Sequence, residues 1–218
     1  MASLIPQDFI GAEKILANYS YSDVSDGTGY IIYYGFAHTE TTNTSYALTT
    51  QSSMMSSAVF TTGATTTPIS KIADIDFDLI FNRPQRIKGK VRATFVFGAA
   101  ETGTASTEGT AYVTIKLRKW DGSTETEIAS ATSATLTFPA QTATWQKNNV
   151  EIDVSTIAAF KAGETMRVTM ELYGADNTNQ RTIKFYHSPD NEDDPNESGV
   201  SETYPTKFMI HIPYLLNI

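Results

Sequence analysis

The sequence predicts an all-β protein, folded as an antiparallel β-sandwich of the jelly-roll kind with an N-terminal arm. From Arg86 onwards apolar and polar residues alternate, which is the pattern of strands with one buried face. Turn residues separate these stretches, as in the Trp-Asp-Gly-Ser turn at 120–123. Charged residues make up only 18% of the chain, against roughly 25% in a typical soluble domain, and Thr and Ser take their place.

The first third of the chain is less regular. An aromatic strand is expected over Tyr30–Phe36, directly after the glycine-containing stretch 27–29. Residues 39–67 are rich in Ser, Thr and Gly, which predicts long loops with one or two edge strands. Alternation returns at Ala73–Phe81, where every second side chain is expected to face the core.

From Arg86 to the C-terminus, strands follow one another closely. Their expected inward residues are Val91, Ala93, Phe95, Phe97, Val113, Ile115, Leu117, Leu136, Phe138, Val150, Ile152, Val154, Met166, Val168, Met170, Leu172, Ile183, Phe185, Phe208, Ile210, Ile212 and Tyr214. Glu125–Ala129 is expected to be the return strand of the hairpin. One helical turn is expected at Thr156–Phe160, because Ser155 can cap it and Gly163 can end it.

The predicted organisation is an N-terminal arm or docking segment, residues 1–29, followed by a single β-sandwich domain, residues 30–218. Within the arm, Asp8–Asn18 fits either a short amphipathic helix or a docked extended segment. The sequence contains no internal repeat and no linker long enough to separate two domains.

Composition excludes several classes of function. The 218 residues include no cysteine, which rules out disulfides, thiolate metal sites and cysteine nucleophiles. The net charge of −8 argues against nucleic acid and anionic membranes as partners, since both require clustered Lys and Arg. The longest apolar run near the start, Ile31–Ala37, is too short for a membrane helix, and no secretory signal begins the sequence. We expect assembly in a cytoplasm.

Two acidic groups raise the question of calcium. Asp74, Asp76 and Asp78 lie on one face of a predicted strand, roughly 6.5–7 Å apart in succession. They could contribute to a Ca²⁺ site or form a solvated face that deters edge pairing. The loop Ser188–Glu202 is dense in carboxylates without the spacing of an EF-hand, which favours a hydrated loop.

No motif in the sequence identifies a reaction. The three histidines, His38, His187 and His211, lack the spacing of a zinc hydrolase, and the serine-hydrolase elbow and the nucleotide-binding glycine motifs are absent. A glycosidase carboxylate pair stays open but cannot be assigned to residues. The sequence therefore predicts no catalytic, cofactor-binding or metal-binding residue, no cofactor, and a protein that is not an enzyme.

The aromatic residues on outward registers have three possible roles. Trp120, Trp145, Tyr112 and Tyr173 could cap the strands locally, anchor a subunit contact, or form a platform on which sugars stack. The position of Trp120 beside a hairpin turn favours the local cap.

A resemblance covers about half of the chain, from Gly109 to Ile218. It rests on four segments, Ala111–Gly122 (AYVTIKLRKWDG), Ile128–Ser133 (IASATS), Phe160–Val168 (FKAGETMRV) and Phe208–Tyr214 (FMIHIPY). In these segments the chain resembles β-rich structural proteins from the virions of tailed bacteriophages.

This resemblance implies a non-enzymatic virion protein with a jelly-roll body. The implied role is a capsid decoration or cement protein, or a minor head protein, which acts through subunit contacts after assembly in the host cytoplasm. The implied partners are the major capsid protein or other virion proteins, together with further copies of the chain, for which a trimer is expected. The alternative is a carbohydrate-binding or receptor-binding module of a phage tail or fibre.

Overall fold

The computed structural model describes residues 17–18, 28–40, 43–54, 56, 59–64, 68–101, 108–139, 143–176, 181–192 and 205–215. All regular structure in these ranges is β, which confirms the predicted fold class. The strands are β1 (Ala17–Asn18), β2 (Thr28–Glu40), β3 (Asn43–Thr49), β4 (Val59–Ala64), β5 (Ser70–Ile80), β6 (Gln85–Glu101), β7 (Gly109–Trp120), β8 (Glu125–Thr132), β9 (Leu136–Phe138), β10 (Thr144–Phe160), β11 (Thr165–Asp176), β12 (Arg181–Tyr186) and β13 (Met209–Leu215). Within the described part of the chain, no helix could span a membrane.

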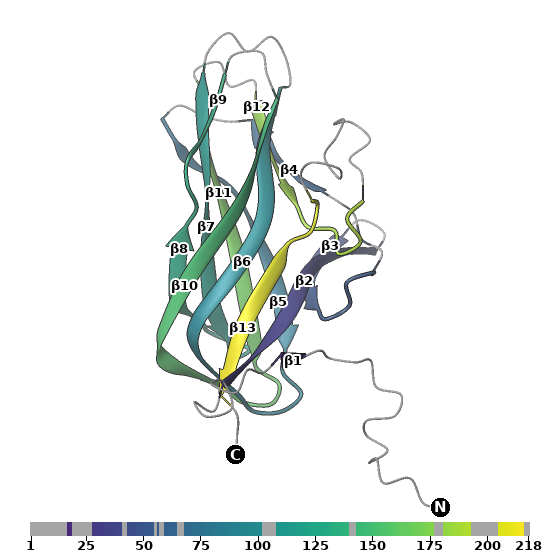
Figure 1. Cartoon of the computed structure of the whole chain (residues 1–218), viewed down its shortest axis with the longest axis vertical. Helices are drawn as coiled ribbons and strands as arrows, with labels where there is room; N and C mark the ends of the chain where they lie inside the picture. The colour runs from purple at the N-terminus through teal and green to yellow at the C-terminus, as the bar shows by residue number, and fades with distance from the viewer. Residues whose placement is uncertain are drawn as a thin grey trace, which may run out of the picture.

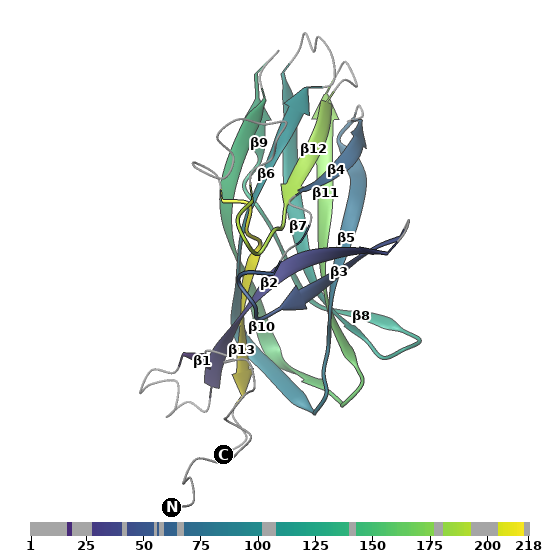
Figure 2. The same cartoon turned by 90° about the vertical axis from the view of Figure 1, so that its right-hand side faces the viewer.

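The strands form one continuous sheet that folds over into two layers (Figures 1 and 2). In the first layer, β6 pairs with β10 along one edge and with β12 and then β13 along the other. In the second layer, β11 lies between β5 and β7, and β8 and β9 continue from β7. Almost all pairs are antiparallel; a single parallel bridge joins β3 to β5.

Strand β2 carries the sheet from one layer to the other. Its first half pairs with β13 and its second half with β3, which continues to β5. At the crossing, the Gly35 N–H donates to the Phe208 carbonyl at 3.0 Å. A Cβ atom at Gly35 would lie 2.5 Å from Phe208 Cδ1 and 2.8 Å from Phe77 Cε1. Only glycine lets the backbone pass so close to these two rings.

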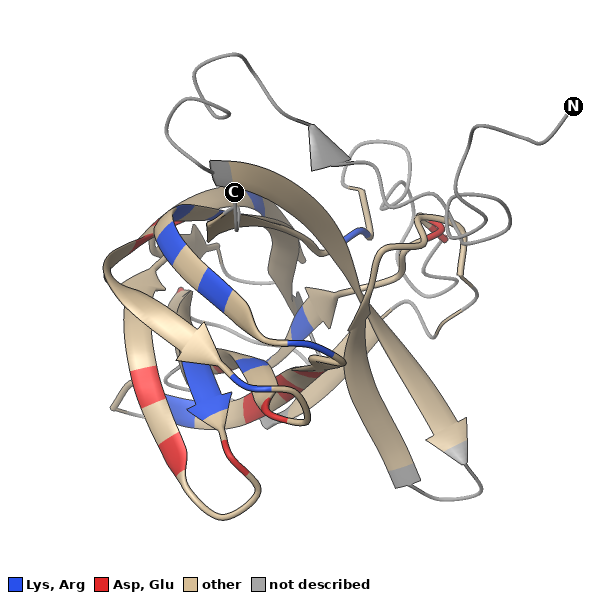
Figure 3. Cartoon of the chain, turned by 90° about the horizontal axis from the view of Figure 1, so that it is seen from below, with Lys and Arg blue, Asp and Glu red and all other residues tan. Residues whose placement is uncertain are grey.

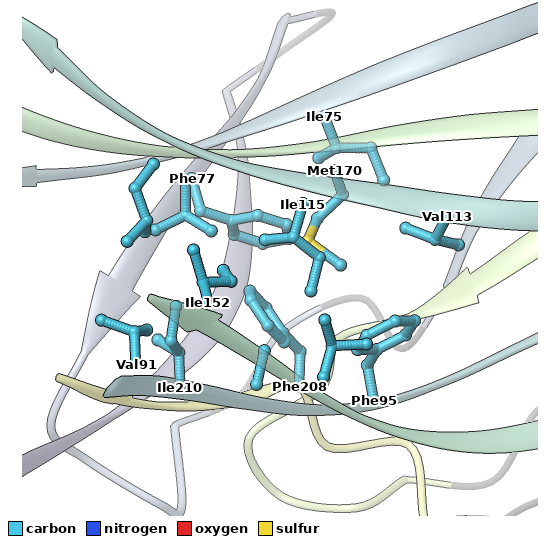
Figure 4. Close-up of a cluster of buried hydrophobic side chains, with 14 of the residues drawn as sticks. Ile75, Phe77, Val91, Phe95, Val113, Ile115, Ile152, Met170, Phe208 and Ile210 are labelled. Atoms are coloured by element: carbon cyan, nitrogen blue, oxygen red, sulfur yellow. The ribbon is translucent and has the colours of Figure 1, made fainter. Parts of the chain in front are cut away.

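The core lies between the two layers (Figure 4). Ile75, Phe77, Val113, Ile115 and Met170 project from the second layer toward Val91, Phe95, Ile152, Phe208 and Ile210 of the first. All ten side chains are buried, as the two-residue periodicity predicts. The phenyl rings of Phe77 and Phe208 meet with their centroids 5.0 Å apart.

The structure corrects the prediction of a helical turn at Thr156–Phe160. Strand β10 continues to Phe160, with a register shift between Val154 and Ala158 opposite β6. The extended conformation is favoured because its backbone groups pair with β6, whereas a capped turn would leave that edge of β6 without a partner.

The predicted N-terminal arm falls mostly outside the described residues. Of the segment Asp8–Asn18, the structure describes Ala17 and Asn18, which pair with Ile31 and Tyr30 of β2 as the short strand β1. The division into an arm, residues 1–29, and a domain, residues 30–218, stays a prediction.

The close approach at Gly35 gives a testable prediction. Gly35→Ala should lower the free energy of unfolding by about 1–3 kcal/mol, because the added methyl group forces Phe208 and Phe77 out of their positions. Urea denaturation measures the change. Thr39→Ala, on the exposed part of the same strand, should change it by less than about 0.5 kcal/mol, and equal effects of the two substitutions would contradict this interpretation.

Candidate functional site

A hollow on the outer face of the first layer brings together polar side chains from three strands. Its lining includes Arg92 and Thr94 of β6, Asn149 and Glu151 of β10, and His211 of β13, and its volume is about 370 Å³. The β-ladders create this grouping, since Arg92 is the register partner of both Glu151 and His211, and Thr94 is the partner of Asn149.

The hollow is lined by hydrogen-bond donors that have no acceptor among the described residues. Thr94 Oγ1 donates to Asn149 Oδ1 at 2.8 Å, which orients the Asn149 amide nitrogen as a free donor. Arg92 Nε donates to Glu151 at 3.4 Å, and its two Nη nitrogens have no partner among the described residues. Burial, and then the charge of Arg92, lower the pKa of His211, which favours its neutral form. The hollow therefore offers hydrogen-bond donors from Arg92 and Asn149 beside the Arg92–Glu151 ion pair.

The sequence pattern places these residues on outward registers but does not bring them together. The alternation showed that Arg92, Thr94 and His211 face away from the core. It could not show that β6 lies between β10 and β13, because these pairings join residues far apart in the sequence.

The outer face of the second layer carries a charge network centred on Glu171. The carboxylate of Glu171 is only 5% exposed and accepts contacts from Lys116 at 3.2 Å, Arg118 at 3.5 Å and Lys71 at 3.7 Å. Three cations around one carboxylate offset the cost of removing its charge from water. This network is built across β5, β7 and β11, so it also holds the ladder in register.

The three aspartates of β5 belong to the same network. Arg167 donates to both oxygens of Asp78, at 2.7 and 2.9 Å, and these bonds raise the pKa of its guanidinium. Asp76 accepts a hydrogen bond from Thr169 at 2.6 Å, and Asp74 pairs with Lys71 at 3.0 Å. The aspartates are therefore engaged with side chains of the chain itself. In the described ranges, no three His, Asp or Glu side chains are grouped so as to hold a metal ion.

Both tryptophans pack against the chain. The Trp145 ring packs against Gly98, where a Cβ atom would lie 1.8 Å from Trp145 Cε3, and it meets the Tyr186 ring edge-on, with centroids 5.6 Å apart. The Arg167 guanidinium lies 5.7 Å from the Trp120 ring centroid. Tyr112 and Tyr173 stack on each other, with centroids 4.7 Å apart and planes 12° apart. The local cap is thus the role that these contacts support.

The three histidines do not meet at one site. His38 lies toward the exposed tip of the β2–β3 hairpin and His211 lies in the hollow. His187 is fully buried, with its ring centroid 5.4 Å from that of Tyr46 and 5.9 Å from that of Phe77. Neither of its nitrogens has a partner among the described residues, and the same holds for the adjacent buried hydroxyl of Ser188. Burial lowers the pKa of His187 to about 4.

The acidic loop Ser188–Glu202 lies mainly outside the described residues. Ser188 to Glu192 belong to the described part, and Asn191 Oδ1 accepts a hydrogen bond from the Thr206 backbone N–H at 2.7 Å. Asn191 has a positive φ of 58°, which asparagine tolerates better than most residues.

Comparison with known proteins gives a likeness of fold. No protein-family model and no curated protein matches the chain. A CocE/NonD family hydrolase from Staphylococcus aureus matches with a TM-score of 0.50 and 12% identity, over 84% of this chain and 36% of the hydrolase chain. An aminopeptidase from a Thaumarchaeota archaeon matches with a TM-score of 0.47 and 10% identity, over 83% of this chain and 36% of that chain. The chain thus spans about a third of the length of these enzymes.

Structures of virus particles match more distantly. Infectious bursal disease virus, Gx strain, matches with a TM-score of 0.30 and 12% identity, over 91% of this chain and 54% of that chain.

The comparison with the hydrolase corrects the expectation that the chain is not an enzyme. That expectation rested on missing motifs, on the all-β pattern and on the resemblance to virion proteins. A hydrolase contains the same fold over most of this chain, so an all-β architecture does not separate this chain from enzymes. At 12% identity the likeness concerns the fold.

The network around Glu171 gives a prediction on stability. Glu171→Gln should lower the free energy of unfolding by about 1.5–3 kcal/mol, because it removes the charge that Lys71, Lys116 and Arg118 share. Glu127→Gln is the matched control: its carboxylate is 44% exposed, contacts Lys116 at 3.7 Å, and should contribute less than about 0.5 kcal/mol. Urea denaturation of both variants decides the matter; a similar loss in both would refute the central role of Glu171.

Buried His187 gives a prediction on pH. Its folded pKa of about 4 lies below the ordinary value of 6.5, so unfolding takes up a proton between these pH values. Stability should be unaffected by His187 above about pH 6.5 and fall by roughly 3 kcal/mol as the pH drops to 4.

His187→Phe isolates this contribution, since phenylalanine fits the surrounding aromatic rings and does not titrate. Urea denaturation between pH 4 and 7 should show a shallower decline for the variant, because the carboxylates common to both proteins cancel in the difference. Parallel curves for the two proteins would show that His187 is not kept neutral.

Proposed function

We propose that this chain is a structural protein of a virus particle, specifically of a tailed phage, and that it acts through contacts made by its outer faces. In this proposal it is a capsid-associated decoration or cement protein, or a minor head protein. Its partners are the major capsid protein or other virion proteins, and further copies of the chain, for which a trimer is expected.

The observation that supports this proposal most is the internal pairing of charges on the outer face of the second layer. Its buried and half-buried charges are already paired across β5, β7, β8 and β11 in the network around Glu171. A face of this kind can be covered by another subunit without leaving an unpaired charge in the interface. The sheet ladders beneath it keep the face rigid, which limits the entropy lost on association.

The sequence resemblance at Gly109–Ile218 points the same way. The resembling segments build β7, β8, β11 and β13, so they contribute strands to both layers of the sandwich.

The likeness to a hydrolase favours a second candidate function. The chain would then correspond to the β-sandwich portion of a hydrolase, about a third of such an enzyme. Fluorogenic esters and peptides, offered to the chain, test this candidate: hydrolysis that follows the chain through purification would support it, and its absence would leave the structural role.

Purified particles provide the test of the structural role. Mass spectrometry of virions from a lysate in which the chain is produced should detect it in a fixed ratio to the major capsid protein. A host protein of similar abundance is the control for carry-over. If the chain is missing from the particles, or is present only at the level of the control, the proposed function is wrong.

A further inference from the structure

A row of basic residues runs along the outer face of β6. Arg86, Lys88, Lys90 and Arg92 alternate with less exposed residues, and all four are exposed; we call them the basic row. Figure 3 shows Lys and Arg as blue bands repeated along a single strand. Four cations within seven residues are unusual in a chain whose net charge is −8.

The basic row is only partly neutralised. Glu151 pairs with Lys90 at 2.5 Å and with Arg92 at 3.4 Å. Arg86 and Lys88 have no ion-pair partner within the part of the chain that the structure describes. Arg86 and Lys88 are like charges without a counter-charge, and an acidic partner would relieve their repulsion.

The spacing of the row suits an extended acidic peptide. Side chains two residues apart on a regular strand are roughly 6.5–7 Å apart, which is also the repeat of an extended ligand. Gly89, with a φ of +113°, interrupts this repeat in β6 between Lys88 and Lys90, so the row presents two cation pairs, Arg86 with Lys88 and Lys90 with Arg92. Carboxylates at alternate positions of such a ligand would therefore meet the successive cations of each pair.

The hollow lies at the Arg92 end of the basic row and can seat one carboxylate. Arg92, whose Nη nitrogens have no partner among the described residues, and Asn149, whose amide nitrogen is a free donor, both line it. Next to the hollow, His211 and Thr94 are flanked across β13 and β2 by the half-buried side chains of Ile32 and Met209. A ligand with an apolar side chain beside its carboxylate would use both surfaces.

We propose that the basic row and the hollow bind an extended acidic segment of a partner protein, with one carboxylate of the segment held by Arg92 and Asn149. Nucleic acid fits less well, because the half-buried side chains of Ile32 and Met209 beside the hollow suit an apolar side chain better than a phosphate backbone. This inference deepens the proposed function by naming the kind of partner, and it can be tested without particles.

Fluorescence anisotropy with a labelled peptide provides the test. The probe is a twelve-residue peptide in which Asp alternates with Thr and Val, and its counterpart with Lys in place of Asp is the control ligand. The acidic peptide should bind saturably at low salt and more weakly at high salt, while the basic peptide should not bind.

Two variants locate the site. Arg86→Gln with Lys88→Gln should weaken binding about three- to tenfold. Asn149→Asp keeps the shape of the side chain, replaces a donor by a carboxylate, and should weaken binding by at least as much. The matched control, Thr126→Glu with Ser130→Glu, makes the same change in net charge at exposed positions of β8 in the other layer and should leave the affinity unchanged.

Three outcomes would overturn the inference. They are no binding of the acidic peptide, equal loss of binding in the control variant, and tighter binding of an oligothymidylate of the same charge than of the peptide. Circular dichroism of each variant shows whether it is folded. If the chain is found in particles but does not bind the peptide, this inference fails and the proposed function stands. If the chain binds the peptide but is missing from particles, the proposed function fails and the acidic-peptide site stands.

Discussion

The pairing of β6 with three other strands is the constraint on which the rest of this structure depends. The strand is 17 residues long, with β10 along one edge and β12 and β13 in succession along the other. Its inward residues, Val91, Ala93, Phe95 and Phe97, fill the space between the two layers. Its outward residues form the basic row and part of the hollow. One strand thus fixes both the core and the surface that we assign to partner binding.

The inward faces of the strands could be predicted from the sequence because the pattern is local. Alternation along Val91–Phe97 depends only on the two-residue repeat of a strand, and all the predicted inward residues there are buried. The turn at 120–123 was predictable for the same reason, and Asp121 Oδ1 accepts hydrogen bonds there from the backbone N–H groups of Ser123 and Thr124.

The partners of the outward residues could not be predicted, because they come from distant parts of the chain. Asp78 pairs with Arg167, 89 residues away, so an acidic strand face that suggested a cation site is in fact one side of an ion-pair network. The strand end at Phe160 was missed for a related reason: a local capping signal at Ser155 competes with pairing to β6, and the pairing prevails. The basic row was not predicted, because the net charge of −8 pointed away from a basic surface, and its meaning depends on β10 and β13 lying beside it.

The fold by itself leaves the function open, since a hydrolase contains a similar fold over 84% of this chain. What distinguishes this chain is the difference between its two outer faces: the second layer pairs its charges internally, whereas the basic row of the first layer keeps cations without partners among the described residues. We therefore locate subunit packing on the second layer and recognition of an acidic segment on the first.

Lysine footprinting of the free chain and of the chain in its native assembly tests this account most directly. Acylation should slow at Lys88 and Lys90 on assembly, because both lie in the basic row. It should stay the same at the amine of a reporter peptide added to both samples as a control. Unchanged reactivity of Lys88 and Lys90 in the assembled chain would contradict the account, because it would show that the outer face of β6 does not meet a partner.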